Sequence, residues 1–154
     1  MIVSGKVFHV AAAAALALCL GTGFAFASAD DAIKGRQGCM KAHGKMVGEL
    51  AAMFKGEKPY DGATVQAAIA ANDAACADWA KWWGPDTQKG ETLETWAKPE
   101  IWTDPAGFNA AGEAFYAKFV AVKDSTDEAG FKAAFPEMGK ACGGCHEKFR
   151  RPKE

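Results

Sequence analysis

Apolar residues recur at helical spacing over most of this chain, and helix-breaking residues divide the pattern into four segments. In the first segment, residues 31–54, apolar residues recur every seven positions, at Ile33, Met40, Val47 and Phe54. Leu50 lies between two of these positions. This spacing is that of one face of a helix and not the alternation of a strand. Gly56 and Pro59 follow and predict the end of this helix.

Three further helices are expected, at residues 62–83, at residues 105–122 and, from a cap within residues 125–127, up to residue 149. Asp61 and Asp104 precede the first two of these as N-caps, and Pro136 should kink the last one. Four helices without a strand pattern predict an all-α fold, an antiparallel four-helix bundle.

One connection is long, the loop of residues 84–103 between the second and third helices. A loop of this length usually has a function. This one carries four large apolar residues: Leu93, Trp96, Ile101 and Trp102. We therefore expect it to fold over something apolar, such as a bound cofactor.

Residues 1–29 have the pattern of a secretory signal peptide. Lys6 precedes an Ala/Leu-rich stretch, and Ala-Ser-Ala stands directly before Asp30 as a cleavage site. The domain would then be residues 30–154, in the periplasm. The alternative is an uncleaved membrane anchor, because residues 10–29 are just long enough to span a bilayer.

Two cysteines and a histidine lie close together in the last predicted helix, as Cys142, Cys145 and His146. At helical spacing the three side chains emerge from one face within about one turn. Two thiols can bond the two vinyl groups of a haem while the imidazole reaches the iron, which is c-type haem attachment. A thioredoxin-like dithiol is the first alternative, but it would require the motif to follow a strand and to lie at a helix N-terminus. A zinc site is the second alternative, and it would need a fourth ligand.

The chain resembles the class II cytochromes c, which comprise cytochrome c-prime and its low-spin relatives of the cytochrome c-556 type. Four stretches carry the resemblance: "RQGCMKAHGKM", "KGEKPYD", "PEIWTDPAGF" and "GKACGGCHEKFR". The resemblance implies one covalently bound haem c, with Cys142 and Cys145 as thioether anchors and His146 as the proximal iron ligand. It also implies a four-helix bundle.

The resemblance implies further contacts with the haem. Arg36 matches an arginine that faces a haem propionate, and a buried arginine does need an anion. Trp102 matches an aromatic residue near the haem edge, although simple core packing would also explain it. Arg150 matches a proximal-side arginine, although a cation at a helix C-terminus explains it equally well.

Met40 occupies the distal position, where low-spin relatives use a methionine sulfur as sixth ligand and five-coordinate relatives leave the iron open. The flanking stretches resemble the low-spin branch more closely, so we expect Met40 to bind the iron. His43 lies three residues later on the same face and is a second candidate, since imidazole also binds iron.

Cys39 and Cys76 have no place in the haem motif. They stand about equally far from the first turn, so antiparallel packing would bring them level. A disulfide between them is a hypothesis from geometry, with two buried thiols as the alternative.

The expected function is that of a periplasmic monohaem electron carrier, not an enzyme, whose partners are periplasmic redox proteins. A five-coordinate protein that binds NO or CO is the alternative. The 18 basic and 19 acidic residues nearly balance, which argues against nucleic acid as a partner. The protein would contact a membrane only through an uncleaved signal sequence or a membrane-bound redox partner. We expect a monomer or a homodimer.

Overall fold

Four long helices make up most of the computed structural model, which describes residues 28–152. They are α1 (Ala29–Phe54), α2 (Gly62–Ala75), α4 (Pro105–Lys123) and α5 (Glu128–Phe149). Three short elements lie between α2 and α4, namely η1 (Trp79–Trp82), η2 (Pro85–Thr87) and α3 (Glu100–Thr103). Within residues 28–152 the only strand-like pairing is an isolated bridge between Ala97 and Arg150. The all-α prediction is confirmed.

Small polar residues begin the long helices as the sequence predicts. The side chains of Asp61, Asp104 and Asp127 accept hydrogen bonds from backbone N–H groups in the first turns of α2, α4 and α5. At the other end of α1, Gly56 has a φ of 74°, a left-handed conformation that glycine adopts without strain. These residues set where the helices start and stop.

Ser28 caps α1 in the same way, by accepting from the N–H of Asp31. The rest of the predicted signal peptide, residues 1–27, lies outside the described residues. No helix in residues 28–152 has the length and apolar character that crossing a bilayer requires.

The second helix is shorter than its predicted range of 62–83. α2 ends at Ala75, and the chain turns at Cys76 before the 3-10 turn η1. In this turn Trp79 contacts two other indoles, with its ring centroid 4.7 Å from that of Trp83 and 6.4 Å from that of Trp82.

Trp82 also packs directly against α1 at Gly35. A Cβ built on Gly35 would overlap the Trp82 indole, so the absence of a side chain there permits the close approach. The Trp82 ring, packed on the backbone of Gly35, therefore holds the 3-10 turn against α1.

The buried face of α1 differs from the predicted seven-residue stripe. Ile33 and Leu50 are buried as expected, but Met40 and Phe54 are each 37% exposed. The buried face lies one position to the side and consists of Ala32, Ile33, Arg36, Cys39, Met46, Leu50 and Met53. α1 packs against both α2 and α5, so its buried face is centred between the two contacts rather than on one stripe.

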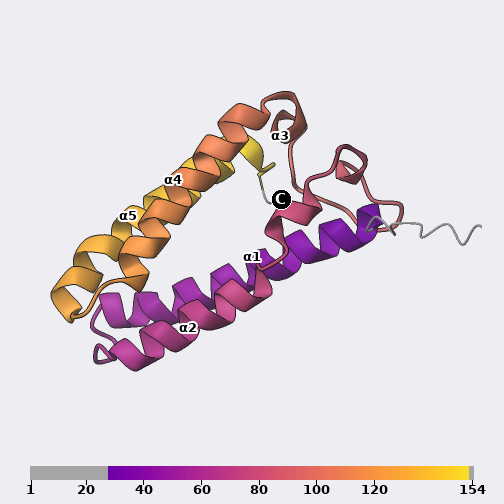
Figure 1. The fold of residues 1–154 in the computed structure, drawn as a ribbon. Coiled ribbons are helices and arrows are strands. Elements are labelled where there is room, and N and C mark those ends of the chain that lie inside the picture. Colours follow the sequence, from indigo (N-terminus) through magenta and orange to yellow (C-terminus); the bar gives the residue numbers. More distant parts are fainter. Residues whose placement is uncertain (1–27, 153–154) are drawn as a thin grey trace, which may run out of the picture.

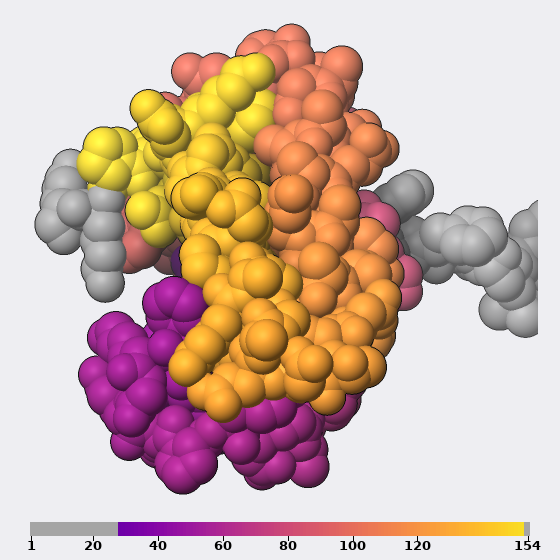
Figure 2. Space-filling view, turned by 90° about the vertical axis from the view of Figure 1, so that its left-hand side faces the viewer, coloured from indigo at the N-terminus to yellow at the C-terminus, as the bar shows by residue number. Residues whose placement is uncertain are grey.

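The helices form two antiparallel pairs, α1 with α2 and α4 with α5. Figure 1 shows that the pairs meet near the turns that join α1 to α2 and α4 to α5, and that they diverge toward the other end of the molecule. Figure 2 looks at the end where they meet and shows the α4–α5 turn lying against the α1–α2 pair. We call these the closed end and the open end of the four-helix bundle.

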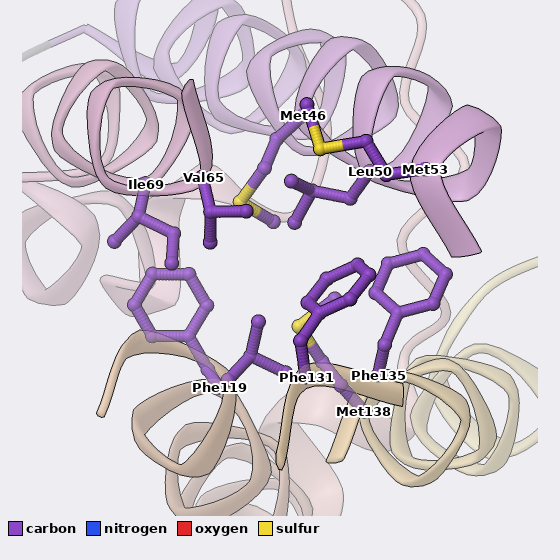
Figure 3. Close-up of a cluster of buried hydrophobic side chains, with 10 residues drawn as sticks. Met46, Leu50, Met53, Val65, Ile69, Phe119, Phe131, Phe135 and Met138 are labelled. Atoms are coloured by element: carbon purple, nitrogen blue, oxygen red, sulfur yellow. The ribbon is translucent and has the colours of Figure 1, made fainter. Parts of the chain in front are cut away.

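A hydrophobic core fills the closed end and joins all four helices (Figure 3). Its buried members are Met46, Leu50, Met53, Val65, Ile69, Phe119, Val122, Phe131, Phe135 and Met138. Truncation of a fully buried member such as Leu50 or Phe131 to alanine would cost about 2–5 kcal/mol. None of the three residues of the cysteine–histidine motif belongs to this core.

A disulfide between Cys39 and Cys76 ties α1 to the end of α2, with the two Cα atoms 4.9 Å apart. The structure thus confirms the pairing that the sequence raised as a hypothesis. The bond lies between the closed-end core and the start of α1, close to the distal candidates Met40 and His43.

Replacing both cysteines by serine should lower the free energy of unfolding by about 3–4 kcal/mol, because the bond closes a loop with a sequence separation of 37. Urea unfolding with and without reductant measures this. The wild-type protein should lose stability in reductant, whereas the double variant should not respond. Labelling of both residues by a thiol reagent in unreduced, unfolded protein would contradict the pairing.

Candidate functional site

The last two turns of α5 carry Cys142, Cys145 and His146, all half-buried. The two cysteines are the free ones among the described residues, since Cys39 and Cys76 are bonded to each other. Their spacing on a regular helix directs all three side chains to one face. The predicted group is therefore together in space.

Burial raises the pKa of both the Cys142 and the Cys145 thiol. The two groups therefore remain protonated S–H groups at neutral pH. A dithiol redox motif works through the opposite effect, a lowered pKa at a helix N-terminus, and here the motif stands at the C-terminal end of its helix with no strand before it in residues 28–152. The thioredoxin-like alternative does not fit.

His146 is favoured in its neutral form. Burial is the largest cause that lowers its pKa, and the charges of Arg150 and His43 lower it further. A neutral imidazole has a free nitrogen lone pair, which is what a metal ligand requires.

Helix geometry indicates that Met40 of α1 faces α5 across the bundle. Met40 precedes Phe54 by 14 residues, two steps of seven. The two side chains therefore point in directions only about 40° apart around the helix axis. The Phe54 ring packs against Phe135 of α5, with centroids 5.6 Å apart. Met40 therefore lies on the side of α1 that looks toward α5.

Met40 and His146 also lie at similar heights along the bundle. From the Phe54–Phe135 contact, Met40 is 14 residues back along α1, about 21 Å, and His146 is 11 residues forward along α5, about 16 Å. The two helices diverge in this direction (Figure 1). Helix geometry thus predicts a thioether and an imidazole on facing helices of the open end.

His43 is held by its neighbours. Its Nδ1 lies 3.0 Å from the carbonyl oxygen of Cys39, which can only accept, so Nδ1 donates and the neutral ring keeps its lone pair on Nε2. The ring packs 5.2 Å from Phe115, centroid to centroid, and burial lowers the pKa of His43.

A zinc site at His43 is excluded by the state of the nearby sulfurs. His43 and the Cys39 and Cys76 sulfurs lie within 4.8 Å of one another, a spacing that would suit a metal. The two sulfurs are bonded to each other, however, and offer no thiolates. This cluster is a disulfide with a histidine against it.

Arg36 is 5% exposed and points into the packing between α1 and the segment after α2. Nη1 donates to the carbonyl oxygen of Trp82 at 3.1 Å, and Nη2 donates to that of Thr87 at 2.7 Å. Its guanidinium carbon lies 4.8 Å from the Trp83 ring centroid and 5.6 Å from that of Trp102. Burial lowers the pKa of Arg36 to about 10, so the group stays charged at neutral pH.

Two buried donors in this place have no hydrogen-bond partner among residues 28–152, the Nε of Arg36 and the Nε1 of Trp83. An unsatisfied buried donor costs about 1–3 kcal/mol. The pair is what a bound group with acceptor oxygens would leave behind when it is removed. A haem would satisfy all of these groups together, because its carboxylates can accept from the two donors, its vinyl groups can bond the two thiols and its iron can bind the neutral imidazole.

The other two predicted haem contacts occupy different settings. Trp102 is half-buried and donates from Nε1 to the carbonyl oxygens of Trp83 and Gly84, at 3.2 and 3.0 Å. Arg150 is exposed at the C-cap of α5, and its backbone pairs with Ala97. Trp102 thus lies beside Arg36, and Arg150 lies one turn beyond His146.

Sequence reasoning missed Trp83, Thr87 and Phe108 as parts of the site. Trp83 and Thr87 both contact the Arg36 guanidinium, through the indole ring and the backbone carbonyl oxygen respectively. Phe108 makes an edge contact with Trp83, with the ring centroids 4.7 Å apart. The pair of adjacent tryptophans before Gly84 is a signal in the sequence, but the local helical pattern predicts that both belong to the end of a helix. Only the turn after Cys76 brings these residues to α1.

Comparison with known proteins agrees with this geometry. A family model described as Cytochrome C' matches residues 31–150. The chain is 39% identical over 127 residues to a cytochrome c-556 of Rhodopseudomonas palustris, which covers 78% of this chain and 83% of the relative.

Solved structures with the same fold include cytochrome c' from Rubrivivax gelatinosus, with a TM-score of 0.73 and 35% identity over 82% of this chain and 99% of that one. A nitric oxide complex of a mutant of cytochrome c prime from Alcaligenes xylosoxidans has a TM-score of 0.71 and 32% identity, and covers 82% of this chain and 99% of that one. The four-helix bundle is thus a known fold with many solved examples.

Replacing Cys142 or Cys145 singly by alanine should leave a haem held by one thioether. The pyridine haemochrome band of the denatured protein should move to longer wavelength, because one vinyl group stays unsaturated. The double variant should lose the haem on denaturation. The matched control is the Cys39→Ala/Cys76→Ala variant, which also removes two cysteines but should keep the two-thioether spectrum; a two-thioether spectrum in either single variant would contradict the assignment.

Proposed function

Because the chain belongs to the cytochrome c' family of periplasmic, non-enzymatic monohaem proteins, we propose that it is a one-electron carrier whose haem iron is held between His146 and Met40. The family implies a covalent c-type haem. When bound, this group supplies the one-electron couple of its iron. The residues of the chain tether it, orient it and set the environment of the metal.

The position of Met40 is the observation that carries this proposal. Its side chain is 37% exposed and takes no part in the closed-end core, so its sulfur is available. By helix geometry it is expected opposite the neutral imidazole of His146, within about one helix turn along the bundle. A thioether opposite an imidazole is the ligand pair associated with raised potentials in electron-transfer cytochromes.

The disulfide supports an electron carrier for a further reason. It joins α1 to α2 at Cys39, directly before Met40, and so restrains the helix turn that presents the sulfur. Efficient electron transfer requires that ligands move little between oxidation states. A covalent restraint beside the distal ligand meets that requirement.

Redox proteins of the periplasm are the proposed partners. The haem-bearing end of α5 includes the exposed Arg150, so an acidic patch on a partner would complement it. The proposal holds for a monomer and for a homodimer.

Binding of NO or CO at an open distal position is the second candidate function. The observation that favours it is the likeness to a cytochrome c prime solved with nitric oxide. In this case Met40 would line the distal side without bonding to the iron. Spin state separates the two candidates.

Replacing Met40 by alanine should convert a low-spin haem into a high-spin one. The ferric far-red charge-transfer band from sulfur to iron should disappear, and the ferrous protein should begin to bind CO readily. Absorption spectra of both oxidation states measure this. The potential should fall, because thioether ligation favours the ferrous state.

Met46→Ala is the matched control, since Met46 is a second methionine of α1 but is buried in the closed-end core. This variant should lose stability and keep the wild-type spectrum. A wild-type protein that is already high-spin, and that binds CO as readily as the Met40 variant, would refute Met40 ligation and favour the second candidate.

A further inference from the structure

Three buried side-chain polar atoms of the described residues lack a hydrogen-bond partner, and two of them are neighbours. They are the Nε of Arg36 and the Nε1 of Trp83. Since the guanidinium carbon of Arg36 is 4.8 Å from the Trp83 ring centroid, both donors belong to one small region. Native proteins pair almost all buried donors, so two orphans in one place indicate a shared missing acceptor.

The remaining contacts of Arg36 explain why its Nε is left over. Nη1 and Nη2 are taken by the carbonyl oxygens of Trp82 and Thr87, and Nη1 also lies 3.4 Å from the Thr87 hydroxyl oxygen. These contacts lock the plane of the guanidinium and leave the Nε edge unused. All of these partners are neutral.

The charge of Arg36 is uncompensated within the described chain. The ion pairs among the described residues do not include it. A buried cation held only by neutral groups and aromatic faces gains strongly from an anion. The missing acceptor should therefore carry negative charge.

The location of the pair identifies the source of that anion. Trp83 contacts Phe108 at 4.7 Å between ring centroids, and Phe108 contacts Phe149 at 5.3 Å. Phe149 lies three residues after His146 on α5. The two donors are thus linked by packed rings to the end of the helix that bears the attachment motif.

We propose that Arg36 Nε and Trp83 Nε1 would together hold one propionate of the haem as hydrogen-bond donors. Trp83 is then a positioning residue, which fixes the cofactor through a neutral hydrogen bond while Arg36 supplies the charge. This inference rests on the covalent haem that the family implies and not on ligation by Met40. It assigns a function to a residue that the resemblance did not mark.

Replacing Trp83 by phenylalanine tests the proposal, because it removes the N–H and keeps a ring against Arg36 and Phe108. The first readout is the pH dependence of the midpoint potential. Ionisation of a propionate lowers the potential as pH rises, because the anion favours ferric iron. Loss of a donor raises the propionate pKa, so this step should move to higher pH by about one unit, the effect of one hydrogen bond to a charged group.

The second readout is the propionate bending mode in the resonance Raman spectrum, which should shift in Trp83→Phe. Trp79→Phe is the matched control. It removes an indole N–H from the same cluster, where the Trp79 ring lies 4.7 Å from that of Trp83 between centroids, but this N–H is not one of the buried donors that lack a partner among the described residues. This control should leave both readouts at their wild-type values.

Two results would overturn the proposal. One is a Trp83→Phe protein whose bending mode and pH profile match the wild type, while Arg36→Gln changes both. The other is a crystal structure of the haem-loaded protein in which a water, and not a carboxylate oxygen, accepts from Trp83 Nε1. Neither readout depends on the spin state of the iron, so failure of Met40 ligation would be seen separately.

Discussion

The apolar core of the closed end is the interaction on which the rest of this structure depends. It is the place where all four long helices meet, and it brings together the two helix pairs through Leu50 and Ile69 on one side and Phe119 and Phe131 on the other. Because this core occupies only one end, the pairs are free to diverge at the other. The proposed iron ligands, Met40 on α1 and His146 on α5, then lie on separate helices at the open end.

The open end is organised by aromatic rings around a buried charge. Arg36 is enclosed by Trp83 and Trp102, and its Nη atoms are held by backbone carbonyl oxygens of the segment after α2. This segment has little regular structure, yet the arginine and the packing of Trp82 on Gly35 hold it against α1. The carboxylate of Asp30 adds a second attachment, since it accepts hydrogen bonds from the backbone N–H groups of Thr92 and Leu93.

Patterns that act over one helix turn could be predicted from the sequence. The spacing of Cys142, Cys145 and His146 depends only on helix geometry, and the caps at Asp61 and Asp104 depend only on their nearest neighbours. The disulfide could be raised as a hypothesis because a single antiparallel turn relates Cys39 to Cys76. Each of these predictions needs no knowledge of how distant segments pack.

What could not be predicted depends on contacts between distant segments. The end of α2 at Ala75 follows from indoles that pack on α1 and α4, so local helix pattern alone continued it to Trp83. The buried face of α1 is shifted because two partners compete for it, which left Met40 partly exposed. The surroundings of Arg36 likewise come from residues 46 and 51 positions away.

A core confined to one end also bears on how such a protein matures. The closed-end core joins all four long helices, and none of the three attachment residues belongs to it. A chain at this stage would have folded half of its bundle while the last two turns of α5 still offered their thiols to the attachment machinery. Covalent loading would then complete the second half of the bundle, so that the cofactor serves as the core of the open end.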